Sequence, residues 1–180
     1  MRLKHCINFH DFRRLAKKRL PGPIFNYIDG AADDEVTYRR NTAAFDTCDL
    51  VPNVLRGVTE VDLSVTVMGQ TLALPVYCSP TALQRLFHHQ GERAVAAAAA
   101  RFGTMFCVSS LGTTSLEEAR RISSTPQAYQ FYFHRDRDLN REMLTRAKKA
   151  GVEVMMLTVD SITGGNRERD LRTGSPFPSG

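Results

Sequence analysis

The feature that most constrains the fold is a regular alternation of apolar runs and helix-like segments over residues 75–160. The apolar runs are LPVYCS, TMFCVSS, QAYQFYF and VEVMMLTVD, and they are separated by segments with helical spacing of apolar residues. Continuous apolar runs are typical of strands buried on both faces of a parallel sheet, with the helices as crossovers. The pattern predicts consecutive βα units, but it does not distinguish an open doubly wound sheet from part of a barrel.

Local signals mark the ends of the predicted helices. Ser115 and Glu118 have the spacing of a capping box, which predicts the start of a helix in TTSLEEARRIS. Gly103 closes GERAVAAAAARFG, and Gly151 closes LNREMLTRAKKAG. Glycine is the usual residue just after a helix, because the chain there often adopts a left-handed conformation.

The chain before residue 60 has helical periodicity. From Phe9 to Leu20, FHDFRRLAKKRL places Phe12 and Leu15 on one face with basic residues opposite, as in an amphipathic helix. IFNYIDGA is short and aromatic, and its glycine marks a bend or a helix end. DDEVTYRRNTAAF predicts a further helix with acidic residues in its first turn, where they suit the helix dipole.

Residues 60–74 change from helical to strand periodicity. Val65 and Val67 alternate with polar residues, and MGQ predicts the turn of a short β-hairpin. The patterns together divide the chain into an N-terminal helical segment (1–59), the hairpin (60–74), about four βα units (75–170) and a loop tail (171–180).

Composition excludes several classes of protein. The 180 residues carry a net charge of +5, and the basic residues are spread through helical segments without interleaved aromatics, which argues against nucleic-acid binding. The four cysteines show no CxxC spacing, so we expect no metal site and mostly buried, reduced thiols. The alanine-rich run at 94–100 is flanked by Glu92, Arg93 and Arg101, unlike a membrane span. These observations predict a cytoplasmic protein, and peripheral contact with the inner membrane stays open.

Each predicted strand ends in polar or reactive residues. Because the carboxyl ends of parallel strands meet at one edge of a sheet, we expect these residues to converge. Ser109, Gln130 and Thr158 are neutral donors and acceptors on three successive strands, a set that suits the polar edge of a planar ring. The alternative is that they only satisfy backbone groups at the strand ends. Neither GxGxxG, a P-loop nor HExxH occurs.

Five ordered blocks carry a resemblance to a known family. They are FRRLAKKRLPGPIFNYIDGAADDEVTYRRNTAAF, LPVYCSPTALQRLFHHQGE, SSLGTTSLEE, YQFYFHRDR and LTVDSITGGNRERDLRTG. The chain resembles the FMN-dependent α-hydroxy acid dehydrogenases and oxidases, which include L-lactate dehydrogenase, glycolate oxidase and mandelate dehydrogenase. The resemblance implies the N-terminal half of a (β/α)8 TIM barrel, preceded by helices and a short β-hairpin. A complete barrel needs about 250 residues.

The resemblance implies two groups of site residues. The flavin group comprises the backbone of Pro80, Thr81 and Ala82 and the side chains of Ser109, Gln130 and Thr158. The substrate group comprises Tyr27 and Arg167 on the substrate carboxylate, Tyr132 on the substrate oxygen, Leu111 beside the substrate side chain, and Asp160 as the partner of a catalytic histidine. Tyr132 and Asp160 are the expected catalytic residues.

The implied function is FMN-dependent oxidation of a small, lactate-like L-2-hydroxy acid to the 2-oxo acid by a full-length enzyme, expected to be a homo-oligomer. The electron acceptor stays open among a quinone, a cytochrome and oxygen. In the family the base is a histidine that, with an arginine and a lysine, comes from later strands. The alternative is therefore a catalytically inactive fragment that acts at most as a binding or assembly half-barrel. A small flavodoxin-like protein is disfavoured, because SPTALQRLF supplies no phosphate loop.

Overall fold

The computed structural model describes residues 2–161 and 163–174, which fall into two compact units. The sheet unit is Val58–Ile162, and the helical unit combines Met1–Gly57 with Thr163–Gly180. Of the predicted loop tail, residues 175–180 lie outside the described residues.

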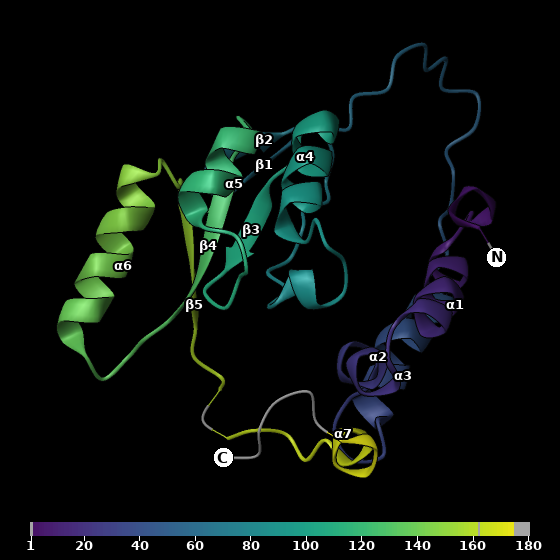
Figure 1. The fold of residues 1–180 in the computed structure, drawn as a ribbon. Helices are drawn as coiled ribbons and strands as arrows, with labels where there is room; N and C mark the ends of the chain where they lie inside the picture. Colours follow the sequence, from purple (N-terminus) through teal and green to yellow (C-terminus); the bar gives the residue numbers. More distant parts are fainter. Residues whose placement is uncertain (1, 162, 175–180) are drawn as a thin grey trace. The chain divides into compact units, whose positions relative to one another are not determined.

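The sheet unit is built around three parallel strands in the order β3-β4-β5. They are β3 (Phe106–Ser109), β4 (Gln127–Tyr132) and β5 (Val154–Thr158). Helices α4 (Glu92–Phe102), α5 (Leu116–Ile122) and α6 (Arg137–Lys149) precede the three strands in turn (Figure 1). The predicted alternation of strands and helices is therefore present, and the carboxyl ends of all three strands lie at one edge of the sheet.

The helix ends predicted at Ser115, Gly103 and Gly151 are confirmed. The Ser115 hydroxyl accepts a hydrogen bond from the Glu118 N–H at 3.1 Å, which caps α5. Gly103 and Gly151 follow α4 and α6 with φ angles of 64° and 76°. A side chain in that left-handed region is strained, so glycine ends each helix at low cost.

The predicted strand at LPVYCS is wrong in extent. It contributes a single parallel bridge, between Cys78 and Phe106, and Val76 is 62% exposed. The Cys78 N–H donates to the Met105 carbonyl at 3.0 Å, and the Cys78 carbonyl accepts from the Cys107 N–H at 2.9 Å. Pro75 has no N–H to donate, so the apolar run cannot pair along its full length.

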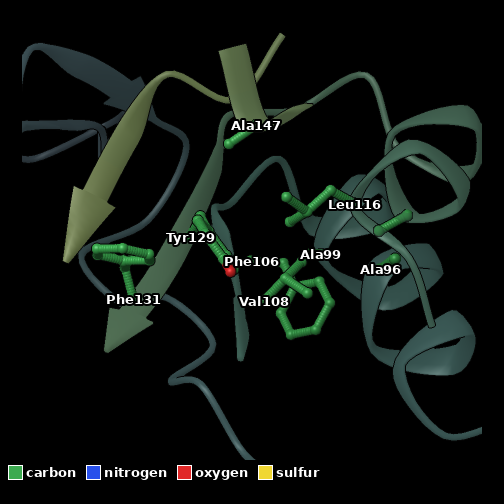
Figure 2. Close-up of a cluster of buried hydrophobic side chains, with 9 residues drawn as sticks. Ala96, Ala99, Phe106, Val108, Leu116, Tyr129, Phe131 and Ala147 are labelled. Atoms are coloured by element: carbon green, nitrogen blue, oxygen red, sulfur yellow. The ribbon is translucent and has the colours of Figure 1, made fainter. Parts of the chain in front are cut away.

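The two faces of the sheet have different coverings. One face packs against α4, α5 and α6 through a core of Ala96, Ala99, Phe106, Val108, Leu116, Ala119, Tyr129, Phe131 and Ala147. Figure 2 shows the labelled members of this core between the strands and the helices. We call this side the helix face.

The opposite face of the sheet is covered, near the start of the strands, by the predicted hairpin. The hairpin strands are β1 (Val65–Val67) and β2 (Gln70–Leu72), which pair antiparallel. A second core joins them to this face through Leu72, Met105, Cys107, Ala128 and Val154. We call this side the inner face.

The helical unit contains the predicted N-terminal helices. They are α1 (Phe9–Arg19), α2 (Gly22–Asp29) and α3 (Val36–Ala43), and the short α7 (Glu168–Thr173) belongs to the same unit. In α1 Leu15 is buried as expected, whereas Phe12 is 49% exposed. The acids expected in the first turn of α3 precede it instead, because Glu35 adopts a left-handed φ of 56° and the helix begins after it.

Short 3-10 helices complete the described elements. They are η1 (Leu3–His5), η2 (Ala44–Thr47) and η3 (Gln84–Leu86). Among the described residues, no helix combines the length and the apolar character that a membrane span requires.

Thiol reactivity should separate the buried from the exposed cysteines. Burial raises the pKa of the Cys107 thiol to about 12, and its sulfur lies 3.6 Å from the Met156 sulfur, whereas Cys48 is exposed. Because the thiolate is the reactive species, we expect iodoacetamide to label Cys48 quickly and Cys107 only after denaturation. Mass spectrometry of the labelled peptides checks this, and equal labelling rates in the native protein would contradict it.

Candidate functional site

Three side chains at the carboxyl ends of the strands form a continuous hydrogen-bonded chain. The Ser109 hydroxyl donates to Gln130 Oε1 at 3.3 Å, and Gln130 Nε2 donates to Thr158 Oγ1 at 2.7 Å. Ser110 donates to the same Gln130 oxygen from both its backbone N–H and its hydroxyl, each at 3.2 Å. We call Ser109, Gln130 and Thr158 the polar triad.

The strand register explains why the polar triad is continuous. Ser109 lies directly opposite Gln130, and the next strand places Thr158 opposite Tyr132, two residues further along β4. Side chains alternate along a strand, so Ser109 shares the inner face with Cys107, and Gln130 shares it with Ala128. The inner face thus changes from apolar at the start of the strands to polar at their ends.

Burial gives the polar triad a fixed arrangement. Ser109 and Gln130 are buried and Thr158 is half-buried. A buried amide must satisfy both its donor and its acceptor, and Gln130 does so through neighbours on both sides. The triad therefore presents neutral donors and acceptors in a defined orientation, without a net charge.

The loop after Cys78 lies beside the end of β3. It contains Pro80, Thr81 and Ala82, and the Leu83 N–H donates to the Leu111 carbonyl at 3.0 Å. The Leu111 N–H in turn donates to the Ser109 hydroxyl at 3.1 Å. The structure therefore brings the predicted flavin backbone stretch next to the polar triad.

The remaining predicted residues of the sheet unit lie at the same edge. Tyr132 is the last residue of β4 and is half-buried, and Asp160 follows β5 and is exposed. The Leu111 side chain is 54% exposed. These side chains are open to a ligand at the carboxyl ends of the strands.

Tyr27 and Arg167 lie together in the helical unit. The Arg167 guanidinium carbon is 5.1 Å from the centre of the Tyr27 ring, and Arg167 also donates to the Tyr27 carbonyl. Its Nε donates to the Asp170 carboxylate at 2.5 Å. Stacking on the aromatic ring and these two hydrogen bonds fix the orientation of the Arg167 guanidinium. The nearby Arg169 instead pairs with Asp29 and Glu35 inside the unit.

Sequence reasoning missed one residue of this region, Glu92. It was interpreted as a flanking charge, but it is fully buried at the start of α4. Burial alone would raise its pKa, but hydrogen bonds, chiefly from the Thr113 hydroxyl and N–H, together leave the pKa of the carboxyl below its ordinary value. The available signal of its burial was its position directly after Gly91 and before an apolar helix. A solvent-exposed acid gives the same pattern.

Comparison with known proteins identifies the class that this fold and site define. The family model described as FMN-dependent dehydrogenase matches residues 16–180. An L-lactate oxidase of a Nostoc species is 40% identical over 178 residues, covering 97% of this chain and 49% of the relative. The glycolate oxidase of Spinacia oleracea is 33% identical and is covered to 46% of its length. A crystal structure of mandelate oxidase matches 96% of this chain and 50% of its own, with a TM-score of 0.89 and 35% identity.

The chain belongs to the FMN-dependent dehydrogenase family. It spans about half the length of the curated relatives that it matches. The sheet unit contains parallel βα units of a (β/α)8 barrel, and the predicted fold class is confirmed. The family cofactor is FMN.

The polar triad is chemically suited to this cofactor. The edge of an isoalloxazine ring carries carbonyl oxygens and ring nitrogens, so it needs neutral donors and acceptors in one plane. Ser109, Gln130 and Thr158 supply hydroxyl and amide groups of this kind, connected to one another and free of net charge. The residues present therefore fit the flavin.

Proposed function

We propose that this chain supplies the first part of the flavin site of an enzyme that oxidises a small, lactate-like L-2-hydroxy acid to the 2-oxo acid. The observation that carries the proposal is the polar triad, which joins three strand ends through Gln130. Membership of an FMN-dependent family supports it. Bound FMN would accept the electrons removed from the substrate, and the triad would bind the flavin ring edge.

The other site residues have separate proposed roles. Tyr27 and Arg167 would bind the substrate carboxylate, since a guanidinium binds a carboxylate through two parallel hydrogen bonds. The Tyr132 hydroxyl would donate to the substrate oxygen, and Leu111 would contact the substrate side chain. Asp160 would stabilise the protonated form of a catalytic histidine that the resemblance places in a later strand.

A second candidate function is an inactive half-barrel that acts through binding or assembly. The exposed apolar side chains in and directly after β5 favour it: Met155, Leu157 and Val159 are 52%, 49% and 75% exposed. Met155 and Leu157 stand opposite Tyr129 and Phe131, so they belong to the helix face, where neighbouring strands are covered. An uncovered apolar face of this kind favours association with a further layer of protein.

The proposal extends to the compartment, the oligomeric state and the electron acceptor. We propose a cytoplasmic compartment, supported by four free cysteines, and a homo-oligomer for the full-length enzyme. The electron acceptor is proposed to be a quinone, a cytochrome or oxygen. The relatives named L-lactate oxidase and glycolate oxidase favour oxygen among these.

A flavin titration tests the cofactor proposal. We expect the purified chain to quench FMN fluorescence, and Gln130→Leu to weaken FMN binding roughly tenfold or more, because the substitution removes two hydrogen-bonding groups. Asn41→Leu, which replaces an exposed amide on α3 of the helical unit, is the matched control and should bind as the unmodified chain does. Equal affinity of the Gln130 variant, with an unchanged circular dichroism spectrum, contradicts the assignment of the triad.

Addition of L-lactate under anaerobic conditions separates the two candidate functions. Loss of the flavin absorbance on mixing shows that the chain alone oxidises the substrate, which contradicts the inactive half-barrel. A stable flavin spectrum with bound FMN favours a fragment whose catalytic base lies elsewhere.

A further inference from the structure

We infer that Glu92 is a positioning residue that holds together two loops beside the proposed flavin contacts. The first loop is residues 79–91, which includes Thr81 and Ala82, and the second is residues 110–115, which follows Ser109. The inference rests on the proposed function, because that function assigns flavin contacts to the first loop and to Ser109, directly before the second loop.

The Glu92 carboxylate accepts hydrogen bonds from both loops. Its Oε1 accepts from the Gln84 N–H at 3.3 Å and from the Thr113 N–H at 2.8 Å. Its Oε2 accepts from the Thr113 hydroxyl at 2.5 Å and from the Thr114 hydroxyl at 3.3 Å. One side chain thus connects two loops that are otherwise about thirty positions apart at their centres.

Burial makes this arrangement costly to break. Glu92 has no exposed surface, and a buried carboxylate is tolerated only when hydrogen bonds replace its water. The four donors meet that need, so removing the carboxylate leaves the Gln84 and Thr113 N–H groups without their acceptor. Gln84 is half-buried and Thr113 is exposed, so the loops would have to move or admit water to satisfy these donors again.

The loops also contact each other where Glu92 holds them. The Leu83 N–H donates to the Leu111 carbonyl at 3.0 Å, and the Arg85 N–H donates to the Thr113 hydroxyl at 3.3 Å. Gly112 allows the tight turn after Ser109, because a Cβ there would lie 2.9 Å from the Ser109 carbonyl oxygen. Glu92 therefore acts on the backbone beside the polar triad through the loops, without lying in the triad.

If Glu92 only stabilised the fold in general, its loss would have a different effect on the loops and the sheet. Its hydrogen-bond donors outside α4 all belong to the two loops and none to β3, β4 or β5. Loss of the carboxylate should therefore loosen the loops more than the sheet. General destabilisation would instead affect the loops and the sheet together.

Amide hydrogen exchange of the purified chain tests the inference. In Glu92→Ala we expect exchange at residues 83–85 and 112–114 to rise roughly tenfold or more relative to the amides of β4. Glu92→Gln should recover most of the protection, because its oxygen can still accept from the two N–H groups and its amide can donate to the two hydroxyls. Glu142→Ala, which removes an exposed acid on α6, is the matched control and should change neither loop.

Thr113→Val covers the case in which Glu92→Ala does not fold. It removes the hydroxyl bond to Glu92 and the acceptor of the Arg85 N–H but keeps the Thr113 N–H bond to Glu92, and it should raise exchange in the same loops to a smaller extent. Equal increases in the loops and β4, or no increase in either variant, overturn the inference.

An FMN titration of the same variants links the loops to the proposed function. Weaker FMN binding by Glu92→Ala, restored in Glu92→Gln, supports positioning of the flavin loops. If the unmodified chain binds no FMN while the exchange pattern is as expected, the proposed function fails for this chain and the clamping of the loops by Glu92 stands.

Discussion

Phe106→Ala is expected to lower the free energy of unfolding of the sheet unit by about 3–5 kcal/mol, the usual cost of deleting a buried phenylalanine. Phe106 lies on β3 with no exposed surface and belongs to the core of the helix face. Its neighbours include Ala96 and Ala99 of α4, whose methyl side chains are too short to fill the cavity that the substitution would leave (Figure 2). Urea unfolding followed by circular dichroism measures the loss.

Phe102→Ala is the control for Phe106→Ala. Phe102 ends α4 and is 62% exposed, so its removal should change stability by less than about 1 kcal/mol. Similar losses for the two variants would mean that the core of the helix face does not hold the sheet unit together.

Most of the fold of the sheet unit could be predicted from the sequence, because its local signals agree with one another. The runs that became β3, β4 and β5 are mainly apolar, and glycine or a cap marks ends of the neighbouring helices. The LPVYCS run failed because apolar character alone does not require strand pairing. Pro75 removes a donor that a longer pairing would use, and the segment keeps one bridge at Cys78.

The polar triad could be predicted because strand periodicity fixes both the edge and the face of each residue. Ser109, Gln130 and Thr158 were expected to converge, and their hydrogen bonds now connect them. Tyr27 and Arg167 are separated by most of the chain, so no periodicity relates them. Only the family resemblance pointed to both, and their contact is seen in the structure.

Glu92 shows what sequence patterns cannot reveal. An acid in the first turn of a helix favours the helix dipole whether it is exposed or buried, so the residue type alone does not tell the two apart. Its burial depends on donors from loops that are remote in sequence, namely Gln84 and Thr113. Such contacts are defined only once the sheet has brought the loops together.

Asp29 joins three helices of the helical unit. Asp29 of α2 binds Arg13 of α1 through two hydrogen bonds, at 2.5 and 2.9 Å, and Arg169 of α7 through a third at 3.0 Å. The Asp29 side chain is 8% exposed, whereas those of Arg13 and Arg169 are 41% and 32% exposed. Because both arginines can recover water, we expect Asp29→Asn to cost about 1–3 kcal/mol, less than breaking a fully buried pair.

The direction of the Asp29 pKa shift determines how the stability that Asp29 contributes depends on pH. The hydrogen bond from Arg13 is the largest cause that lowers the pKa of Asp29 below the ordinary value of 3.8, and burial opposes it. A carboxyl with a lowered pKa in the folded state stabilises the fold above its unfolded pKa, and this stability is lost as the pH falls through the folded pKa. The stability difference between the unmodified chain and Asp29→Asn should therefore be full near neutral pH and shrink below about pH 4.

Urea unfolding of both proteins across this acid range measures the shrinking difference. Asp138→Asn is the control, because Asp138 pairs with Arg141 with its side chain 89% exposed and should show no measurable difference at any pH. A difference between the unmodified chain and Asp29→Asn that stays constant with pH would show that Asp29 holds the helices through packing, because an ion pair loses its stabilising charge when the carboxyl is protonated.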